Sequence, residues 1–271
     1  MPKLKPESIA SLEAYISFIE RLRPHNNGPL WFRGCGKLSY QLKPSLYRHK
    51  GTSNIEDLMT LEKQLIARFQ QRSIPFLPRS LSDTWECLFL MQHYGVPTRL
   101  LDWSESPLMA LFFAGTSALH TLGSRGKPIF STDAAIWILD PVQWNKKAVD
   151  LKSFKGAVLT TDDSNVSAYK PVGDVNTMKQ YPISIYGAHN SQRIVAQRGV
   201  FVCFGKDTRS METVYERENL PADCLRKLFT KKSVLPKIYE ALRRHGLTDS
   251  VVFPDLDGLA REIKREFAFE V

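Results

Sequence analysis

Side chains able to bind a ligand or move a proton are concentrated between Met91 and Pro107. The segment contains His93, Tyr94, Thr98, Arg99, Asp102, Trp103 and Glu105. Apolar periodicity predicts buried helices on both sides of it, over residues 82–91 and 106–119, so it would be a polar connection held in place by the core. A fixed connection of this kind suits binding or catalysis. Its polar groups could equally cap helix ends and satisfy buried backbone groups, and both readings stay open.

An arginine ends the short apolar strand predicted over residues 30–34. The planar guanidinium of Arg33 stays charged and can grip a phosphate or a carboxylate with two parallel hydrogen bonds. Gly34 follows it and opens a Gly-x-Gly bend. A ligand contact and a structural ion pair with a carboxylate of the fold are the two roles open to Arg33.

Several common catalytic motifs are absent. The sequence has no phosphate-binding P-loop, no dinucleotide-binding glycine fingerprint and no nucleophile elbow. Its six histidines lack metal-ligand spacing, and we expect no metal site. His93 stands out because Tyr94, Arg99 and Asp102 lie close to it in sequence. Asp255 and Asp257 precede a predicted helix, where carboxylates commonly cap free N–H groups.

Composition favours a globular protein with an anionic partner. The hydrophobic content of 43% and charged content of 24% are ordinary, and the formal net charge is +9. A basic balance suits a nucleic acid, a dinucleotide or an acidic protein surface, and a solvated surface explains it almost as well. No apolar run approaches the roughly 18 residues of a membrane-spanning helix. The four scattered cysteines and the lack of a signal peptide indicate the cytoplasm.

The rest of the chain predicts one α+β domain, residues 1–271, with helices around a central mixed or antiparallel sheet. An N-terminal helix is expected over about 8–23, capped by Ser8, followed by a core over about 28–267. Further helices are expected over 55–72, 234–244 and 259–267, and further strands over 134–140, 181–186, 200–205 and 224–230. Turns are expected at 24–29 and 123–127. Residues 145–180 are predicted to form a long excursion that acts as a lid or contacts a target.

Several motifs in this order resemble the FRG domain family, whose name matches Phe32-Arg33-Gly34. The resemblance is carried by residues 31–34 (WFRG), 44–48 (PSLYR), 92–103 (QHYGVPTRLLDW), 106–107 (SP) and 110–114 (ALFFA), and continues through 192–193 (QR), 196–201 (AQRGVF) and 253–258 (FPDLDG). It spans roughly residues 10–265. The family occurs often in bacteria and phages.

A more distant likeness connects the chain with ADP-ribosyltransferases. The order of parts is similar: an early-strand arginine, a central turn before an aromatic-rich helix, and a polar residue before a late strand. The likeness implies a split sheet and NAD as co-substrate, with transfer of ADP-ribose to a macromolecular acceptor, a protein or a nucleic acid. Such enzymes act as toxins or phage-defence effectors. They cleave NAD mainly by binding it and stabilising an oxocarbenium-like ribose.

The same likeness implies roles for individual residues. Arg33 with Gly34 would hold the phosphates or the adenosine ribose. Tyr94 or Trp103 would stack on nicotinamide. Gln197 would be the polar residue before the late strand, which in that fold holds ribose hydroxyls. Since Gln197 replaces the usual Glu, Asp102 or Glu105 becomes the candidate carboxylate, with His93 beside it. The remaining residues expected to contact the dinucleotide are Thr98, Arg99, Gln192 and Arg193. The alternative function is a non-catalytic module that binds nucleic acid or nucleotide through a basic surface.

Overall fold

The computed structural model describes residues 4–22, 28–77, 79–81, 83–122, 128–149, 154–188 and 191–269. They form an α+β fold with one open, mixed sheet of eight strands, as the sequence predicted. The helices are α1 (Leu12–Arg21), α2 (Ile55–Ser73), α3 (Thr84–His93), α4 (Pro107–Ala118), α5 (Pro141–Ala148), α6 (Gln192–Ala196), α7 (Met211–Arg217), α8 (Leu235–Arg244), α9 (Asp249–Val252) and α10 (Leu256–Glu266).

The sheet follows the order β1-β10-β6-β2-β3-β9-β8-β7. Its two outermost pairs, β1 with β10 and β7 with β8, are parallel, and every other pair is antiparallel. A separate hairpin joins β4 to β5. The strands are β1 (Glu7–Ser8), β2 (Trp31–Cys35), β3 (Leu100–Ser104), β4 (Leu119–Leu122), β5 (Pro128–Phe130), β6 (Ala134–Leu139), β7 (Leu159–Thr160), β8 (Ile183–Tyr186), β9 (Gly199–Cys203) and β10 (Leu225–Thr230).

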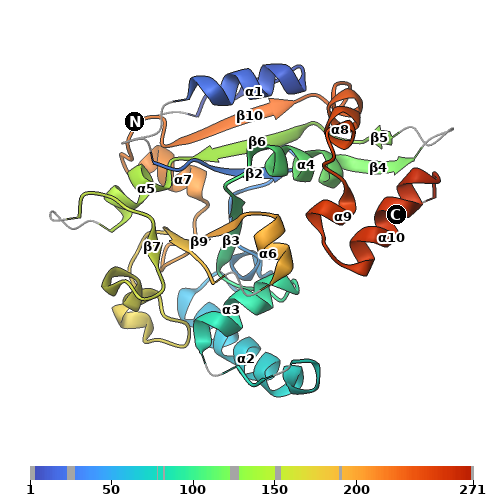
Figure 1. Ribbon diagram of the computed structural model, residues 1–271. Helices are drawn as coiled ribbons and strands as arrows, with labels where there is room; N and C mark the ends of the chain where they lie inside the picture. Colours follow the sequence, from blue (N-terminus) through green and yellow to red (C-terminus); the bar gives the residue numbers. More distant parts are fainter. Residues whose placement is uncertain are drawn as a thin grey trace.

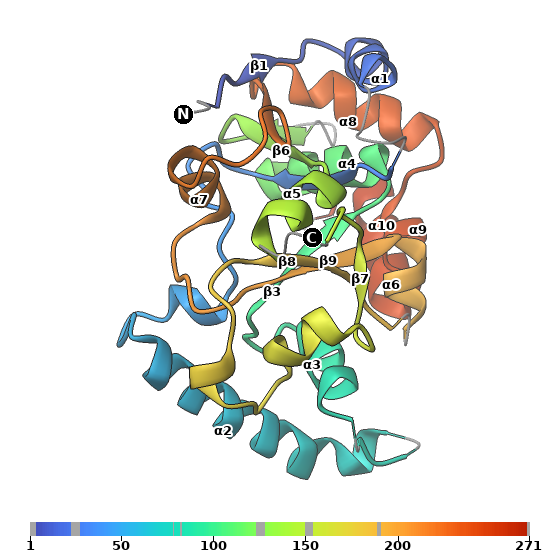
Figure 2. The same ribbon diagram turned by 90° about the vertical axis from the view of Figure 1, so that its left-hand side faces the viewer.

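The middle of the sheet is its weakest junction. β2 and β3 share a single register pair, Phe32 with Ser104, whereas β2 pairs with β6, and β3 with β9, over five residues each. The sheet therefore consists of two half-sheets, β1-β10-β6-β2 and β3-β9-β8-β7, that diverge beyond this pair. Figures 1 and 2 show α1 and α8 beside the first half-sheet and α2 and α3 at the opposite end of the molecule.

Strand periodicity divides the core into two layers. Trp31 faces one buried cluster and its neighbour Phe32 faces the other, and β6 alternates in the same way. The cluster that includes Phe32 packs against α1, α4 and α8, while the cluster that includes Trp31 packs against α2, α3, α5 and α7. All six residues of β6 are buried, which explains its unbroken apolar sequence.

Local capping sets where the site's helices begin. Asp83 accepts from the N–H groups of Trp85 and Glu86 at the start of α3, and Ser106 caps α4 with Pro107 at its first position. Gly95, with φ of +74°, follows the end of α3 and supplies the left-handed residue that commonly ends a helix. The predicted helices over 55–72, 82–91, 106–119, 234–244 and 259–267 and strands over 30–34, 134–140, 181–186, 200–205 and 224–230 are all present with small shifts of their ends.

Two element predictions were wrong. Residues 100–104 are not a loop but strand β3, because the buried side chains of Leu100, Leu101 and Trp103 fit beside β9. The first helix starts at Leu12 and is capped by Ser11 rather than Ser8, since residues 7–8 are extended and pair with β10.

Part of the predicted excursion over 145–180 has regular secondary structure. Within the predicted excursion over 145–180, α5, β7 and two 3₁₀ helices are present, and the side chains of Val166 and Tyr169 are buried. The predicted turns at 24–29 and 123–127 lie wholly or largely outside the described residues. The four cysteines are buried and unpaired. In the described ranges, no helix is long and apolar enough to cross a membrane.

Candidate functional site

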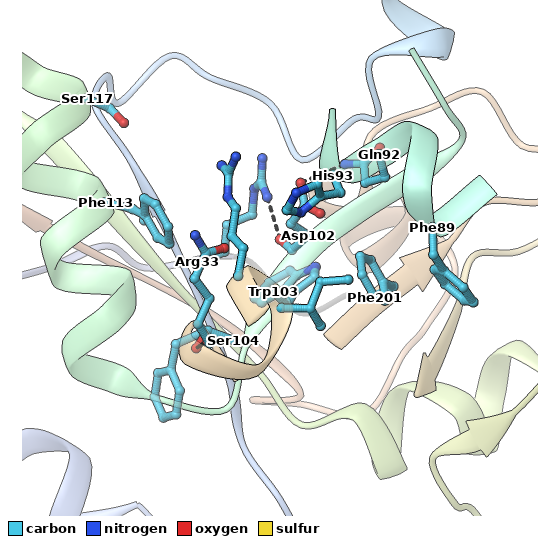
Figure 3. A pocket seen from close by; sticks show the side chains of 15 residues that line it. Arg33, Phe89, Gln92, His93, Asp102, Trp103, Ser104, Phe113, Ser117 and Phe201 are labelled. Atoms are coloured by element: carbon cyan, nitrogen blue, oxygen red, sulfur yellow. Dashed lines mark hydrogen bonds between the residues drawn. The ribbon is translucent and has the colours of Figure 1, made fainter. Parts of the chain in front are cut away.

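The candidate site lies where β2 and β3 separate. Continuing their antiparallel register would pair Gly34 with Asp102, but the strands have already diverged there. The Asp102 backbone carbonyl instead accepts a hydrogen bond from Nη1 of Arg33, which spans the gap (Figure 3). The arginine thus bridges the two half-sheets, and among the described residues its other N–H groups remain free for a ligand.

A cavity of about 250 Å³ opens at this junction and is called the inner cavity below. Arg33, His93 and Asp102 all line it, although they come from separate parts of the sequence. Figure 3 shows His93 and Gln92 beside Asp102, with Phe113 and Ser117 across from them. The lining residues are Phe32, Arg33, Gly34, Phe89, Gln92, His93, Asp102, Trp103, Ser104, Phe113, Ser117, Arg193, Ile194, Gln197 and Phe201.

The carboxylate of Asp102 is held by a short relay of hydrogen bonds. Gln92 donates from Nε2 to Asp102 Oδ2 over 2.7 Å. The oxygen of the Gln92 amide accepts from the Thr98 hydroxyl, which in turn accepts from the Leu100 N–H over 3.1 Å. Because Thr98 fixes which end of the amide faces Asp102, Gln92 presents its N–H donor to the carboxylate and holds the Asp102 side chain in place.

His93 ends α3 at the rim of the inner cavity. Its Nδ1 lies 3.2 Å from the Ser191 hydroxyl, which itself caps α6 by accepting from the Ile194 N–H. Partial burial and the positive charge of Arg193 lower the pKa of His93, with Asp255 opposing them. The imidazole is therefore neutral near pH 7 and can accept or donate a proton.

Arg193 brings a second positive charge to the inner cavity. Its guanidinium lies over the Phe253 ring, 4.6 Å from the centroid, and Arg261 lies 4.1 Å from the same ring. Burial lowers the pKa of Arg193 and the charge of Asp102 raises it. Two arginines from different elements, Arg33 and Arg193, thus face a cavity that holds one carboxylate.

Trp103 and Gln197 add further polar groups to the lining of the inner cavity. The Trp103 side chain is buried, and its indole N–H has no partner among the residues that the structure describes. Gln197 lines the inner cavity, and its Nε2 donates to the Val252 carbonyl over 3.1 Å. That bond leaves the amide oxygen of Gln197 as an acceptor for a ligand hydroxyl.

A second, more open hollow of about 510 Å³ adjoins the inner cavity and is called the outer hollow below. His93 and Arg193 line both spaces. Tyr94 and Gln192, which we expected at the dinucleotide, line the outer hollow only. Its remaining walls are Ser191, Pro254, Asp255, Leu256 and Asp257.

Other expected site residues lie elsewhere. Thr98 and Arg99 are fully buried, so the prediction that they contact a ligand was wrong. Arg99 pairs with buried Glu62, with 3.2 Å between Nε and Oε1, and donates to the Tyr169 carbonyl over 2.8 Å. Glu105 does not line the inner cavity and lies 3.7 Å from Arg198. Gly34 lines the cavity, and it also packs so closely on α4 that a Cβ would collide with the Ala110 carbonyl.

Several site residues were missed by the sequence analysis. Gln92 had a usable signal, because it immediately precedes His93 at the end of a predicted helix. Phe113 and Ser117 are four residues apart in α4 and so share a helix face, but an apolar run gives no sign of which face borders a cavity. Phe253 acts through Arg193, and only the tertiary structure reveals that contact.

Comparison with known families identifies the segment that carries most of this site. Residues 28–121 match the family model of the FRG domain. The matched segment includes Arg33, Gln92, His93, Asp102 and Trp103, whereas Arg193 and Gln197 lie outside it. No curated protein and no solved structure matches the chain. The likeness to ADP-ribosyltransferases therefore stays an expectation.

Proposed function

We propose that this protein, which carries an FRG domain over residues 28–121, binds NAD at the junction of its half-sheets and cleaves the bond between nicotinamide and ribose. ADP-ribose would then pass to a macromolecular acceptor or to water. One observation carries the proposal: a carboxylate oriented by Gln92 faces a cavity bridged by an arginine from the opposite half-sheet.

The charges of the inner cavity suit a dinucleotide. Arg33 and Arg193 can neutralise the pyrophosphate, and Arg33 offers the forked donors that phosphate oxygens accept. Trp103 and Phe113, which both line the inner cavity, supply apolar surface for nicotinamide. A free Gln197 amide oxygen can accept from a ribose hydroxyl.

The chemistry requires little covalent participation by the protein. As the C1′–N bond breaks, its electron pair leaves with nicotinamide, and positive charge develops on the ribose. The fixed carboxylate of Asp102 stabilises that charge more than it stabilises the bound substrate. Neutral His93, at the rim, can accept the proton of the attacking acceptor or water.

Measuring NAD affinity, nicotinamide release and Tm on the same variants tests this proposal. Arg33→Ala should weaken NAD binding about 10- to 150-fold, because a charge-assisted contact is worth roughly 1.5–3 kcal/mol. Arg33→Lys should recover only part of the loss. Asp102→Asn should preserve affinity and reduce turnover by about tenfold or more. Glu105→Gln is the matched control and should leave turnover unchanged, because Glu105 lies outside the inner cavity.

Two results would contradict the proposal. If Asp102→Asn lowers Tm but the folded variant releases nicotinamide normally, Asp102 is structural. If wild-type protein neither binds NAD nor releases nicotinamide, and instead shifts a nucleic acid in a salt-dependent way, the net charge of +9 serves nucleic-acid binding.

A further inference from the structure

Building on the proposed function, we infer that the outer hollow binds the adenylate half of the dinucleotide, with the base at Tyr94, the ribose at Asp255 and the phosphates at Arg193. The inner cavity would then receive the nicotinamide ribosyl half, and Arg33 would contact the pyrophosphate from that side. Each space then holds one half of the ligand, and Arg193 contacts the pyrophosphate that joins the two halves.

The sizes of the two spaces support this division. Small-molecule sites typically enclose about 300–1,000 Å³, and the inner cavity of about 250 Å³ falls below that range. The outer hollow adds about 510 Å³ and begins at His93 and Arg193, which border both spaces. A dinucleotide that enters the inner cavity with one half therefore finds room for its other half in the adjoining outer hollow.

Arg193 lies where the anionic link of such a ligand would pass. Its position is set by the Phe253 ring, on which Arg261 also lies. Two guanidinium groups on one ring repel each other, and an anion beside Arg193 would relieve that repulsion. The contact with the Phe253 ring favours this position of Arg193, so less ordering of the side chain is required when a ligand binds.

Tyr94 offers a platform for the base. Its side chain is 65% exposed, although most large aromatic residues of this chain are buried. The ring meets the His93 ring edge to face, with 4.7 Å between centroids and 88° between planes. His93 therefore fixes the orientation of Tyr94, whose exposed ring surface borders the outer hollow.

Asp255 supplies the acceptor for the ribose. Its Oδ1 accepts from the Gly258 N–H over 2.7 Å and caps α10. Among the described residues, its second oxygen has no hydrogen-bond donor, so it can accept from a ribose hydroxyl. The same carboxylate would repel a 2′-phosphate, so the outer hollow should accept NAD and reject NADP.

Binding of two half-ligands tests the assignment. ADP is the probe for the outer hollow, and nicotinamide mononucleotide is the probe for the inner cavity. Tyr94→Ala should weaken ADP binding about 5- to 100-fold, the usual range for loss of a stacked base, and should change nicotinamide mononucleotide binding less than twofold. Tyr94→Phe keeps the ring and should bind ADP as wild type does. Tyr40→Ala removes another exposed tyrosine and should have no effect.

Selectivity between NAD and NADP supplies a second readout. Wild-type protein should bind NAD at least tenfold more tightly than NADP, and Asp255→Asn should narrow that ratio. Asparagine retains the helix cap, so the variant should keep its Tm. Equal affinity of wild type for the two dinucleotides would contradict the role given to Asp255.

The results separate this inference from the proposed function. Nicotinamide release together with ADP binding that is unaffected by Tyr94→Ala overturns the outer-hollow assignment and leaves the proposed activity standing. ADP binding that depends on Tyr94, without nicotinamide release from NAD, supports the outer hollow as a nucleotide site and rejects the proposed activity. Absence of ADP binding by wild-type protein overturns the inference outright.

Discussion

His93 is the residue whose protonation the site controls most directly. Partial burial and Arg193 hold the pKa of His93 below its ordinary value of about 6.5, and Asp255 only partly offsets them. As pH falls, the unfolded chain takes up a proton at this position before the folded chain does. The stabilising contribution of neutral His93 is therefore complete above about pH 6.5 and is lost as pH falls through the lower, folded pKa.

The corresponding prediction concerns thermal stability. Between about pH 7.5 and about pH 5, Tm of the wild-type protein should fall more than Tm of His93→Gln, because glutamine does not titrate. Other groups also titrate over this interval, so the difference between the two profiles is the quantity to measure. Parallel profiles would mean that the pKa of His93 is the same in the folded and unfolded chains.

Sequence reasoning located the site's charged residues better than it assigned their roles. Arg33, His93 and Asp102 were recognisable because each is a reactive type beside a predicted element end. The roles of Thr98 and Arg99 depended on partners that sequence does not reveal. Thr98 turns toward Gln92, and Arg99 turns toward Glu62, 37 positions earlier in the chain. The burial of Thr98 and Arg99 follows from those contacts, and no local sequence pattern predicts it.

At the scale of elements, the packing of β2 on α4 depends on the missing side chain of Gly34. An added Cβ would collide with the Ala110 carbonyl and approach the Ala114 N–H within 2.5 Å, and both are rigid helix backbone. Gly34→Ala should therefore lower the free energy of unfolding by about 1–3 kcal/mol. Gly115→Ala is a matched control in α4, where the nearest atom is the Tyr239 ring at 3.7 Å. It should be neutral or stabilising by up to about 1 kcal/mol.

Chemical denaturation of the two glycine variants measures this difference. If Gly34→Ala unfolds at the same denaturant concentration as wild type, β2 and α4 have room to separate. A loss of stability in Gly115→Ala of the same size would show that α4 rejects any added methyl group.

The ion pair of Arg99 and Glu62 fastens α2 to the second half-sheet. Both side chains are buried, so removing one partner leaves an uncompensated charge. Arg99→Met alone or Glu62→Leu alone should cost about 3–5 kcal/mol of unfolding free energy, and the double variant should cost less than either. Denaturation of the three variants is the measurement. Additive losses would show that the two side chains contribute independently.

Most elements could be predicted from periodicity and capping, and the failures have physical causes. β3 was taken for a loop because Asp102 and Ser104 make its sequence look polar, yet its burial pattern follows from pairing with β9. The short β1 was read as the first turn of a helix, since two residues carry no periodicity of their own. The residue at which β2 and β3 diverge could not be predicted, because no sequence pattern specifies over how many residues two strands pair.

At the scale of the whole molecule, the chain passes repeatedly between the half-sheets. It crosses from β2 to β3, returns to β6, crosses to β7 and returns after β9 to β10. Each half-sheet is therefore assembled from segments that are distant in sequence, and the inner cavity lies between them. The prediction that residues 1–271 form one domain is compatible with this path, because the sheet draws strands from Glu7 to Thr230.

A fragment that contains only the family-matched residues 28–121 should not fold. β2 would lack its neighbour β6, and β3 would lack its neighbour β9, so buried surfaces on both strands would be exposed. Circular dichroism and thermal melting should show a cooperative transition for the full chain and none for the fragment. A cooperative melt of the fragment would contradict this expectation.

The repeated crossing also has a consequence for cutting the chain. Every backbone break between Trp31 and Thr230 separates at least one pair of adjacent strands onto different pieces. A break between Phe32 and Phe201 also divides the residues that line the inner cavity between the two pieces, and each piece retains the strand edge that the other needs. Two pieces that are expressed separately and then mixed should reassociate and regain ligand binding. The amount of ligand bound should rise with the concentration of the scarcer piece.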